Sequence, residues 1–456
     1  MEQNINTKEQ KTAKTAIKLS DHFSYKKIFR FTLPSIAMML FSSVYGIVDG
    51  FFVSNFVGKT AFAAVNFIMP VLIIISTFGF MLGTGGSALV GKTLGEKDTE
   101  KANSLFSLFV YIAAALGVVI SGFAIIFMPN IALALGAKGK MFELSVIYGR
   151  IISAALPAYM LQLEFQSFFV TAEKPHLGFY TTLASGLTNM VLDALFMAVF
   201  KMGVAGAAVA TAISQTVAAL IPIVYFLKEN KSLLKLGKTK WNGKAVLKAA
   251  SNGSSELMSN ISMSLVGMLY NVQLLKYAGE NGVSAYGVLM YVNMIFIAVF
   301  IGYAVGSAPI FSYNFGSANH KELKSLLKKS LTIIGVSSVL MFISAEIFKG
   351  VLSGIFVGYE KELYNLTVRA FLIFGFSFIF SGLSIFASSF FTALNDGLTS
   401  ALISFLRTLV FQLSAILILP LIWGIDGIWA SVVVADAISF AVSILFLAVK
   451  RKKYKY

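Results

Sequence analysis

One carboxylate stands out in the first apolar run of this sequence. The run extends from Phe31 to about Phe56, which is long enough to span a bilayer, and Asp49 is its only charge. A charged side chain at that depth is costly unless it faces protein, water or a cation. Asp49 is therefore a candidate functional residue, and the alternative is an acid at a helix end that reaches the membrane interface.

A second intramembrane acid occurs at a comparable depth. Asn189 and Asp193 are four residues apart, so they share one face of a predicted helix. Asp193 precedes Lys201 by eight residues, and Thr211 follows Lys201 by ten residues on the returning helix. At about 1.5 Å per residue, these polar groups fall at a depth similar to that of Asp49.

Two tyrosines are expected near these groups. Tyr45 lies one helical turn before Asp49, and Tyr148 lies near the outer start of the fourth predicted helix. Two carboxylates, an amide and a hydroxyl form an all-oxygen set that suits a hard cation such as Na⁺. The same pair of acids also suits protons, because burial and like-charge proximity both favour a protonated carboxyl group. A purely structural polar cluster joining two helices is the alternative.

Four further charged residues lie in apolar runs. Glu256 is a candidate for substrate binding or for a second proton, and a snorkelling or interface role is the alternative. Glu164 is expected near the cytoplasmic end of its helix, and Arg407 and Asp436 are candidates for a structural ion pair.

The composition identifies the class of protein. Of the 456 residues, 57% are hydrophobic and only 13% are charged, which excludes a soluble enzyme. The chain has no cysteine, and its three histidines do not have metal-ligand spacing, so we expect no cofactor or bound metal beyond a coupling ion. The net charge of +16 fits basic loops facing anionic lipid better than it fits a nucleic-acid partner.

The apolar runs predict an all-α polytopic membrane protein with twelve transmembrane helices. The expected spans are 30–56, 61–84, 103–128, 143–168, 177–200, 203–227, 250–276, 282–310, 326–348, 365–391, 398–420 and 425–449. Most of the 37 Lys and Arg residues fall in the two termini and in alternate connections between these spans. By the positive-inside rule, both termini are expected to be cytoplasmic.

An internal repeat divides the chain into two halves. Gly95 and Gly316 end equivalent segments, and the same spacing of 221 positions pairs Gly58 with Gly279. Each half has six spans, so the halves are predicted to be parallel repeats, as in many transporters. The expected organisation is a cytoplasmic segment 1–29, a six-helix bundle 30–227, a basic cytoplasmic linker 228–249, a second six-helix bundle 250–449 and a cytoplasmic tail 450–456.

At these residues the chain resembles the multidrug and toxic compound extrusion (MATE) family of the MOP flippase superfamily. The resemblance covers nearly the whole chain and rests on the following segments: Pro34 with Val48-Asp49-Gly50 and Gly58, the segment ending at Gly95, Asn189-x-x-x-Asp193, Gly203-x-x-Gly206 through Thr211, and Pro309 through Gly316.

The resemblance implies a two-lobed fold and efflux of organic, often cationic, compounds in exchange for H⁺ or Na⁺. In such transporters Asp49, Asn189, Asp193 and Thr211 match a cation site, Pro34 matches a position where the first helix bends, and Glu256 matches an acid of the seventh helix. The second half has no such site, because Asp49 falls on Tyr270 and Asp193 on Ser414 under the 221 spacing. Ion coupling is therefore expected in the first half.

The predicted function is thus secondary active efflux by a non-enzymatic transporter of the cell membrane, with small organic compounds and membrane lipid as its partners. A monomer is the expected state. A flippase for a lipid-linked precursor is the alternative function, and a channel is disfavoured because no filter or pore-lining ring is visible.

Overall fold

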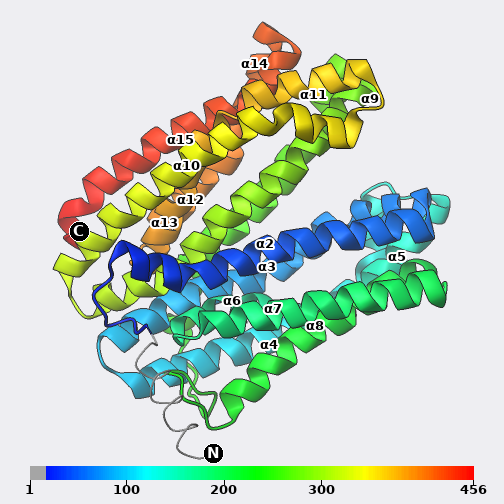
Figure 1. Ribbon diagram of the computed structural model, residues 1–456. Coiled ribbons are helices and arrows are strands. Elements are labelled where there is room, and N and C mark those ends of the chain that lie inside the picture. The colour runs from blue at the N-terminus through cyan, green and yellow to red at the C-terminus, as the bar shows by residue number, and fades with distance from the viewer. Residues whose placement is uncertain (1–16) are drawn as a thin grey trace, which may run out of the picture.

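The structure is a computed structural model that describes residues 17–456, apart from the side chain of Lys59. Within this range the chain forms helices and no strand (Figure 1). A membrane-embedded backbone must satisfy its own hydrogen bonds, and a continuous helix does this within each apolar run.

The first half contains six membrane-spanning segments. Their bounds are α2 Tyr25–Phe52 continued by η1 Val53–Val57, α3 Lys59–Gly95, α4 Thr99–Ala134, α5 Gly139–Ala154 with α6 Leu156–Thr171, α7 Pro175–Asp193 continued by η2 Ala194–Val199, and α8 Gly203–Leu227. The symbol η marks a π-helical segment.

The second half begins at Gly243, seven residues before the expected span. Its elements are α9 Gly243–Gly316, α10 His320–Val357, α11 Lys361–Phe374 with α12 Ser377–Ala393, α13 Gly397–Phe405 continued by η3 Leu406–Phe411 and α14 Gln412–Trp423, and α15 Ile425–Tyr454.

Twelve spans are present, as the apolar runs predict. Nine helices of the described chain are individually long and apolar enough to cross a membrane. The pairs α5–α6 and α11–α12, bent by 58° and 49°, are one broken span each. The 74-residue α9 is two spans, because Gly279 at φ 59° and ψ −149° interrupts its helical backbone.

The backbone confirms that the halves are parallel repeats. Left-handed backbone conformations occur at Gly58 and Gly279, at Lys97 and Ala318, and at Gly203 and Gly424. Each pair is separated by the same 221 positions that relate the two halves of the sequence. The turns between successive spans therefore recur in the same places, each with a residue of positive φ.

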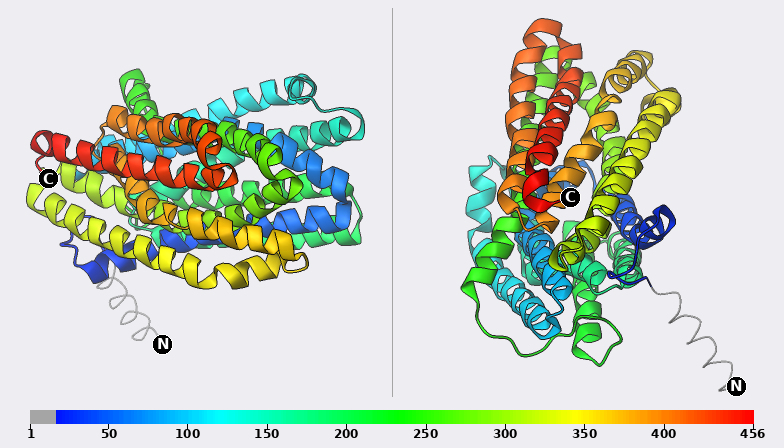
Figure 2. Two further views of the ribbon diagram at one scale, coloured as in Figure 1. Left: turned by 90° about the horizontal axis from the view of Figure 1, so that it is seen from above. Right: turned by 90° about the vertical axis from the view of Figure 1, so that its left-hand side faces the viewer.

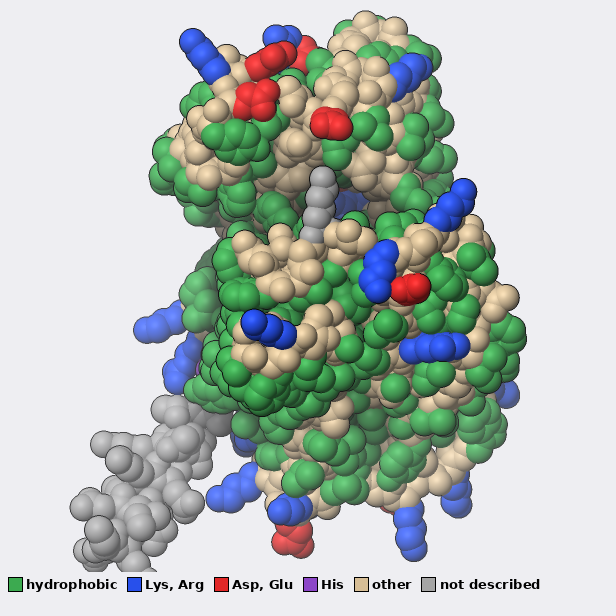
Figure 3. All heavy atoms as spheres, turned by 90° about the vertical axis from the view of Figure 1, so that its right-hand side faces the viewer, with side chains coloured by type: hydrophobic (Ala, Val, Ile, Leu, Met, Phe, Trp, Pro, Cys, Tyr) green, Lys and Arg blue, Asp and Glu red, His purple; other side chains and the backbone are tan. Residues whose placement is uncertain are grey.

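The helices form two lobes, α2 to α8 and α9 to α15. The lobes meet at the end of the molecule that holds the C-terminus and diverge towards the opposite end (Figures 1 and 2). We call these the closed end and the open end. Seen from the open end, a cleft separates the two lobes (Figure 3).

Glycines allow the close contact at the closed end. A Cβ atom on Gly253 of α9 would overlap the carbonyl oxygen of Met81 on α3, and one on Gly85 would overlap that of Ala249. The span of α3 was expected to end at residue 84, but the helix continues to Gly95. The additional turns are Gly-rich rather than apolar, and they pack against α9 instead of facing lipid.

Helix α2 also packs against the second lobe. Gly302 and Gly306 of α9 lie against the backbone or side chains of Thr32, Ser35 and Ile36. Pro34 lies between these contacts, it is buried, and α2 is one continuous α-helix through it.

Candidate functional site

The two intramembrane acids lie where helices change type. Asp193 is the last residue of α7 and directly precedes η2, and the carbonyl of Asp49 accepts a hydrogen bond from Val53, where η1 begins. Short π-helical segments inside α-helices are frequent at functional sites. Here they occur on the two helices that carry the acids, and both lie towards the open end.

The carboxyl groups of Asp49 and Asp193 lie within hydrogen-bonding reach of each other. Asp193 is fully buried, and neither of its carboxyl oxygens has a hydrogen-bond donor. Oδ1 of Asp49 is likewise buried without a donor. Two ionised carboxylates in this arrangement would repel each other and lack solvation, so the pair requires a shared proton or a bound cation.

Amide and hydroxyl groups complete the cluster. Nδ2 of Asn189, one turn before Asp193 and also buried, lies 3.5 Å from Oγ1 of Thr211 on α8. Tyr148 of α5 lies within hydrogen-bonding reach of Thr211 and close to both acids, and its hydroxyl is 3.8 Å from the sulfur of Met69. The structure thus brings the predicted residues Asp49, Asn189, Asp193, Thr211 and Tyr148 together.

Tyr45 links this cluster to residues that the sequence did not single out as part of it. Its hydroxyl lies within hydrogen-bonding reach of Gln162 and close to Tyr159 and Asp49. Tyr159 in turn reaches Ser76 of α3. Gln162 lies two residues before Glu164, which the sequence predicted near the cytoplasmic end of its helix. Pro157 is the sequence feature that could have indicated this contact, because a proline in an apolar run favours a break in the helix that redirects the following turns.

Apolar packing surrounds part of the cluster. Gly186 of α7 lets the rings of Phe41 and Tyr45 of α2 approach its backbone closely. A buried apolar cluster formed by α3, α4, α5, η1, η2 and α8 includes Val53, Ile68, Tyr148 and Met197. Electrostatic interactions among the polar groups are correspondingly strong in this low-dielectric surrounding.

The donor set decides which ions fit. Among the described residues, no three His, Cys, Asp or Glu side chains form a group suited to a metal such as zinc. The carboxyl oxygens of Asp49 and Asp193, the amide oxygen of Asn189 and the hydroxyl of Thr211 are hard ligands, which suit Na⁺ or a proton.

The remaining predicted residues lie outside this cluster. Glu256 is on α9, in the other lobe, one turn beyond the contact of Gly253 with Met81. Glu164 of α6 is fully buried, and neither carboxyl oxygen has a hydrogen-bond partner among the described residues. Pro34 belongs to the contact between α2 and α9.

The second lobe contains a charge pair of a different kind. Nε of Arg407, in η3, donates a 2.9 Å hydrogen bond to Oδ1 of Asp436 on α15, and the Asp436 side chain is only 2% exposed. Tyr270, which corresponds to Asp49 under the repeat, lies close to Asp436 and stacks on Tyr286 with ring centroids 5.3 Å apart. Asp436 therefore already has a cationic partner.

Comparison with known proteins gives consistent results. The MatE family model matches residues 34–195 and again residues 257–417, so one model matches both halves and together more than half of the chain. The multidrug export protein MepA of Staphylococcus aureus (strain MRSA252) is 26% identical over 438 residues, which is 94% of each chain.

Solved structures share the fold over nearly the whole chain. A structure described as the outward-facing conformation of a multidrug resistance MATE family transporter of the MOP superfamily superposes with a TM-score of 0.91, at 22% identity, covering 97% of this chain and 99% of the other. A structure of MATE in the straight conformation gives a TM-score of 0.89 at 21% identity, covering 95% and 98%. The chain therefore belongs to the MatE family and is a MATE transporter, as its motifs indicated.

Proposed function

We propose that this protein is an antiporter that exports organic, often cationic, compounds from the cell in exchange for H⁺ or Na⁺. The observation that carries the proposal is the pair of buried carboxyl groups of Asp49 and Asp193, which face each other without a hydrogen-bond donor. A transporter that binds and releases a cation needs such a pair of acids, whereas Asp436 already has Arg407 as a fixed partner.

In this proposal the coupling ion binds to Asp49, Asn189, Asp193 and Thr211. Tyr45 and Tyr148 support the two acids from α2 and α5, and both phenol groups lie close to Asp49. Glu256, three residues after the contact of Gly253 with α3, is a candidate for contact with substrate.

The closed end faces the cytoplasm in this proposal. The turns at Gly95 and Gly316, the linker between α8 and α9, and the C-terminal residues lie there, and these are the Lys-rich segments of the sequence. The positive-inside rule then places both termini in the cytoplasm and makes this conformation outward-open. Residues 1–16, which include three of the lysines used for this rule, lie outside the described residues.

Export requires that ion binding favour one conformation over the other. Binding of one monovalent cation lowers the charge of the Asp49–Asp193 pair from −2 to −1 and relieves the repulsion between α2 and α7. Helix α2 is then free to repack near Pro34, where it contacts Gly302 and Gly306 of the other lobe. The cavity shrinks and substrate is released at the open end.

The substrate class follows from similarity and from the cleft. MepA is named a multidrug export protein, and it matches this chain over 94% of its length. We therefore infer that organic drugs enter the space between the two lobes of this protein, and that the protein acts as a monomer in the cell membrane.

Purified protein in liposomes tests this function. Ethidium, an organic cation, should accumulate against its gradient when a H⁺ or a Na⁺ gradient is imposed, and a protonophore or a Na⁺ ionophore should abolish the accumulation. Transport of ethidium that is equal with and without both gradients would refute antiport. Gradient-independent transfer of labelled lipid between leaflets, without ethidium transport, would favour a flippase.

A further inference from the structure

A groove lies on the outer face of the second lobe at the closed end. It has a volume of about 740 Å³, and its walls are α10 and α15 with α12 between them. Most of its lining is apolar, including Leu331, Ile379, Phe440 and Ile444. Three cationic residues line it, and these are Lys324, Lys328 and Arg451.

The repeat shows how the first lobe uses the same region. There the linker that follows α8 lies against α4: the N–H of Lys235 donates to Asn103 (2.7 Å) and the N–H of Gly237 to Ser107 (3.0 Å). The hydroxyl of Tyr111 donates to the carbonyl of Gly237, and the side chains of Leu234 and Leu236 are buried against α4 and α8. A segment of the chain itself thus occupies this groove.

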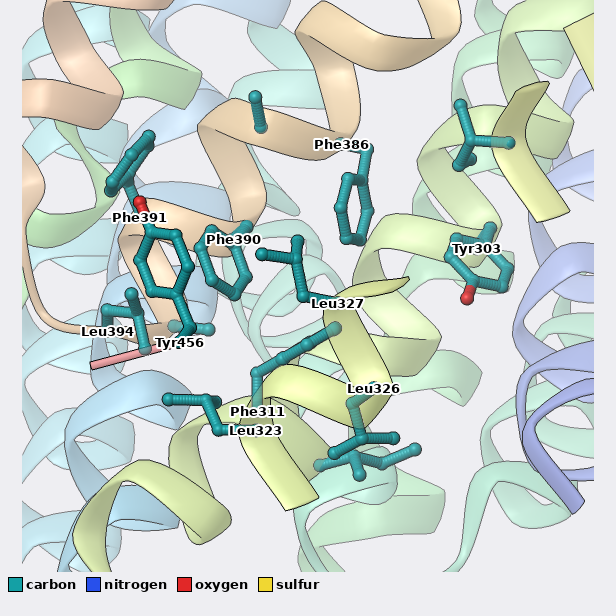
Figure 4. Close-up of a cluster of buried hydrophobic side chains, with 14 of the residues drawn as sticks. Tyr303, Phe311, Leu323, Leu326, Leu327, Phe386, Phe390, Phe391, Leu394 and Tyr456 are labelled. Atoms are coloured by element: carbon teal, nitrogen blue, oxygen red, sulfur yellow. The ribbon is translucent and has the colours of Figure 1, made fainter. Parts of the chain in front are cut away.

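The second lobe presents different side chains at the equivalent positions. Under the spacing of 221, Asn103 corresponds to Lys324, Ser107 to Lys328 and Tyr111 to Thr332. Groups that bind a neutral backbone in one lobe are replaced by two ammonium groups in the other. Tyr456 also lines the groove, and its ring packs on Phe390 near Leu394 (Figure 4).

The described acidic residues near the groove are paired with groups other than Lys324 and Lys328. Glu322, on the same helix, binds His22 and the N–H of Phe23, and Asp396 binds Thr399 and lies 3.4 Å from Lys450. Nε of Arg451 donates to the carbonyl oxygen of Tyr456. No ion pair of Lys324 or Lys328 occurs within the described part of the chain.

We propose that this groove binds an anionic phospholipid of the leaflet at the closed end, with the phosphate at Lys324 and Lys328 and one acyl chain along the groove. The lining residues of α10 extend from Lys324 to Ser338, which at about 1.5 Å per residue is about 21 Å. This length is enough to cross one leaflet, half of the roughly 30 Å hydrocarbon core. Gly335 keeps the path open, since a Cβ atom there would meet nothing within 4 Å.

Native mass spectrometry of the full-length protein with phosphatidylglycerol and phosphatidylcholine tests the proposal. The double variant Lys324→Gln/Lys328→Gln should bind phosphatidylglycerol about thirtyfold more weakly, because each lysine near an anionic lipid contributes roughly a fivefold factor. Its affinity for phosphatidylcholine should change little. The control Lys321→Gln/Lys452→Gln removes the same charge from α10 and α15, the two outer walls of the groove, at exposed positions that do not line it.

A second variant tests the acyl chain separately. Gly335→Leu fills open space and should weaken phosphatidylglycerol binding while leaving both lysines in place. Free glycerol phosphate should show no saturable binding to the wild type. The proposal would be overturned if the groove variant and the control variant lost the same amount of affinity for phosphatidylglycerol. Tight binding of glycerol phosphate that Gly335→Leu does not affect would also overturn it.

Discussion

Buried acids in the two lobes are compensated in two different ways. Asp436 has Arg407 as a fixed partner, whereas Asp49 and Asp193 have only each other. Because an uncompensated charge in a protein interior is unstable, the first arrangement suits a structural element and the second a site that exchanges ions. This contrast explains why the two lobes share a backbone arrangement but have different polar residues within their membrane spans.

The structural role of Arg407 is open to test by a double-mutant cycle. Arg407→Met leaves Asp436 buried without its partner and should lower the free energy of unfolding by roughly 3–5 kcal/mol. Arg407→Met/Asp436→Leu replaces both charges by apolar groups and should recover most of that stability. Thermal unfolding in detergent measures both, and equal destabilisation of the single and the double variant would contradict the role.

At this scale the sequence predicted the acids well and their neighbours only in part. Asp49 and Asp193 are conspicuous because charges are rare in apolar runs, and the spacing of Asn189 placed it on the same face. The contact of Tyr45 with Gln162 depends on the 58° bend between α5 and α6. Periodicity predicts a helix but not the direction of a bend, so this neighbour was missed.

Among the elements, a short N-terminal strap joins the two lobes at the closed end. The N–H of Leu19 donates to Glu173, which follows α6, over 2.6 Å. Nδ1 of His22 lies 2.6 Å from Glu322 of α10, and the N–H of Phe23 donates to the same carboxylate. The side chains of Leu19 and Phe23 are fully buried. The strap therefore stabilises the conformation in which this end is closed.

Glu173 gives this strap a pH dependence. Burial raises the pKa of Glu173 above its ordinary value of 4.5, although the N–H of Leu19 and the charges of Lys18 and Lys174 act in the opposite direction and Asp21 adds to the rise. The stability that Glu173 contributes is therefore complete below about pH 4.5 and is lost as the pH rises through its pKa in the folded state.

Glu173→Gln should remove that dependence, because glutamine keeps the acceptor for Leu19 and does not titrate. The variant should unfold at the same temperature as the wild type near pH 4 and at a slightly higher temperature at neutral pH. Thermal scans across this range provide the measurement. A difference between the two proteins that is constant with pH would contradict the assignment.

Elements were predictable where hydropathy alone decides them. The expected span 203–227 coincides with α8, and the count of twelve is confirmed. Helix ends were less predictable, since α3 continues to Gly95 beyond its expected end at residue 84. Turns stabilised by packing at the closed end carry no hydropathy signal, and neither do the π-helical segments.

For the molecule as a whole, glycines at the closed end set how tightly the lobes meet. Gly253→Ala places a Cβ against the carbonyl of Met81 and should push α9 away from α3. Gly267→Ala is the matched control, because it is on the same helix and has nothing within 4 Å. Both substitutions gain the same helix propensity, so a difference between them reflects contact with the other lobe.

A single introduced cysteine can report how far the lobes separate at the closed end, since the sequence contains no cysteine of its own. Ser312→Cys lies buried at the closed end near Gly91. It should resist a membrane-impermeant thiol reagent in the otherwise unchanged protein and with Gly267→Ala, and it should react several-fold faster with Gly253→Ala. Identical labelling rates in all three would show that Gly253 does not hold the lobes together.

If the Asp49–Asp193 pair binds the coupling cation, Asp49→Asn should abolish coupled transport. Asparagine keeps the size of the side chain and removes its charge. Asp426→Asn is the control, because Asp426 pairs with the exposed Arg369 at the open end, far along the chain from the site.

Ethidium transport in liposomes is measured for each protein under imposed H⁺ and Na⁺ gradients. We expect Asp49→Asn to fold and insert normally but to transport ethidium only at the rate of passive leak under both gradients. Asp426→Asn should transport like the wild type. If Asp49→Asn pumps ethidium at the wild-type rate under both gradients, the Asp49–Asp193 pair does not bind the coupling cation.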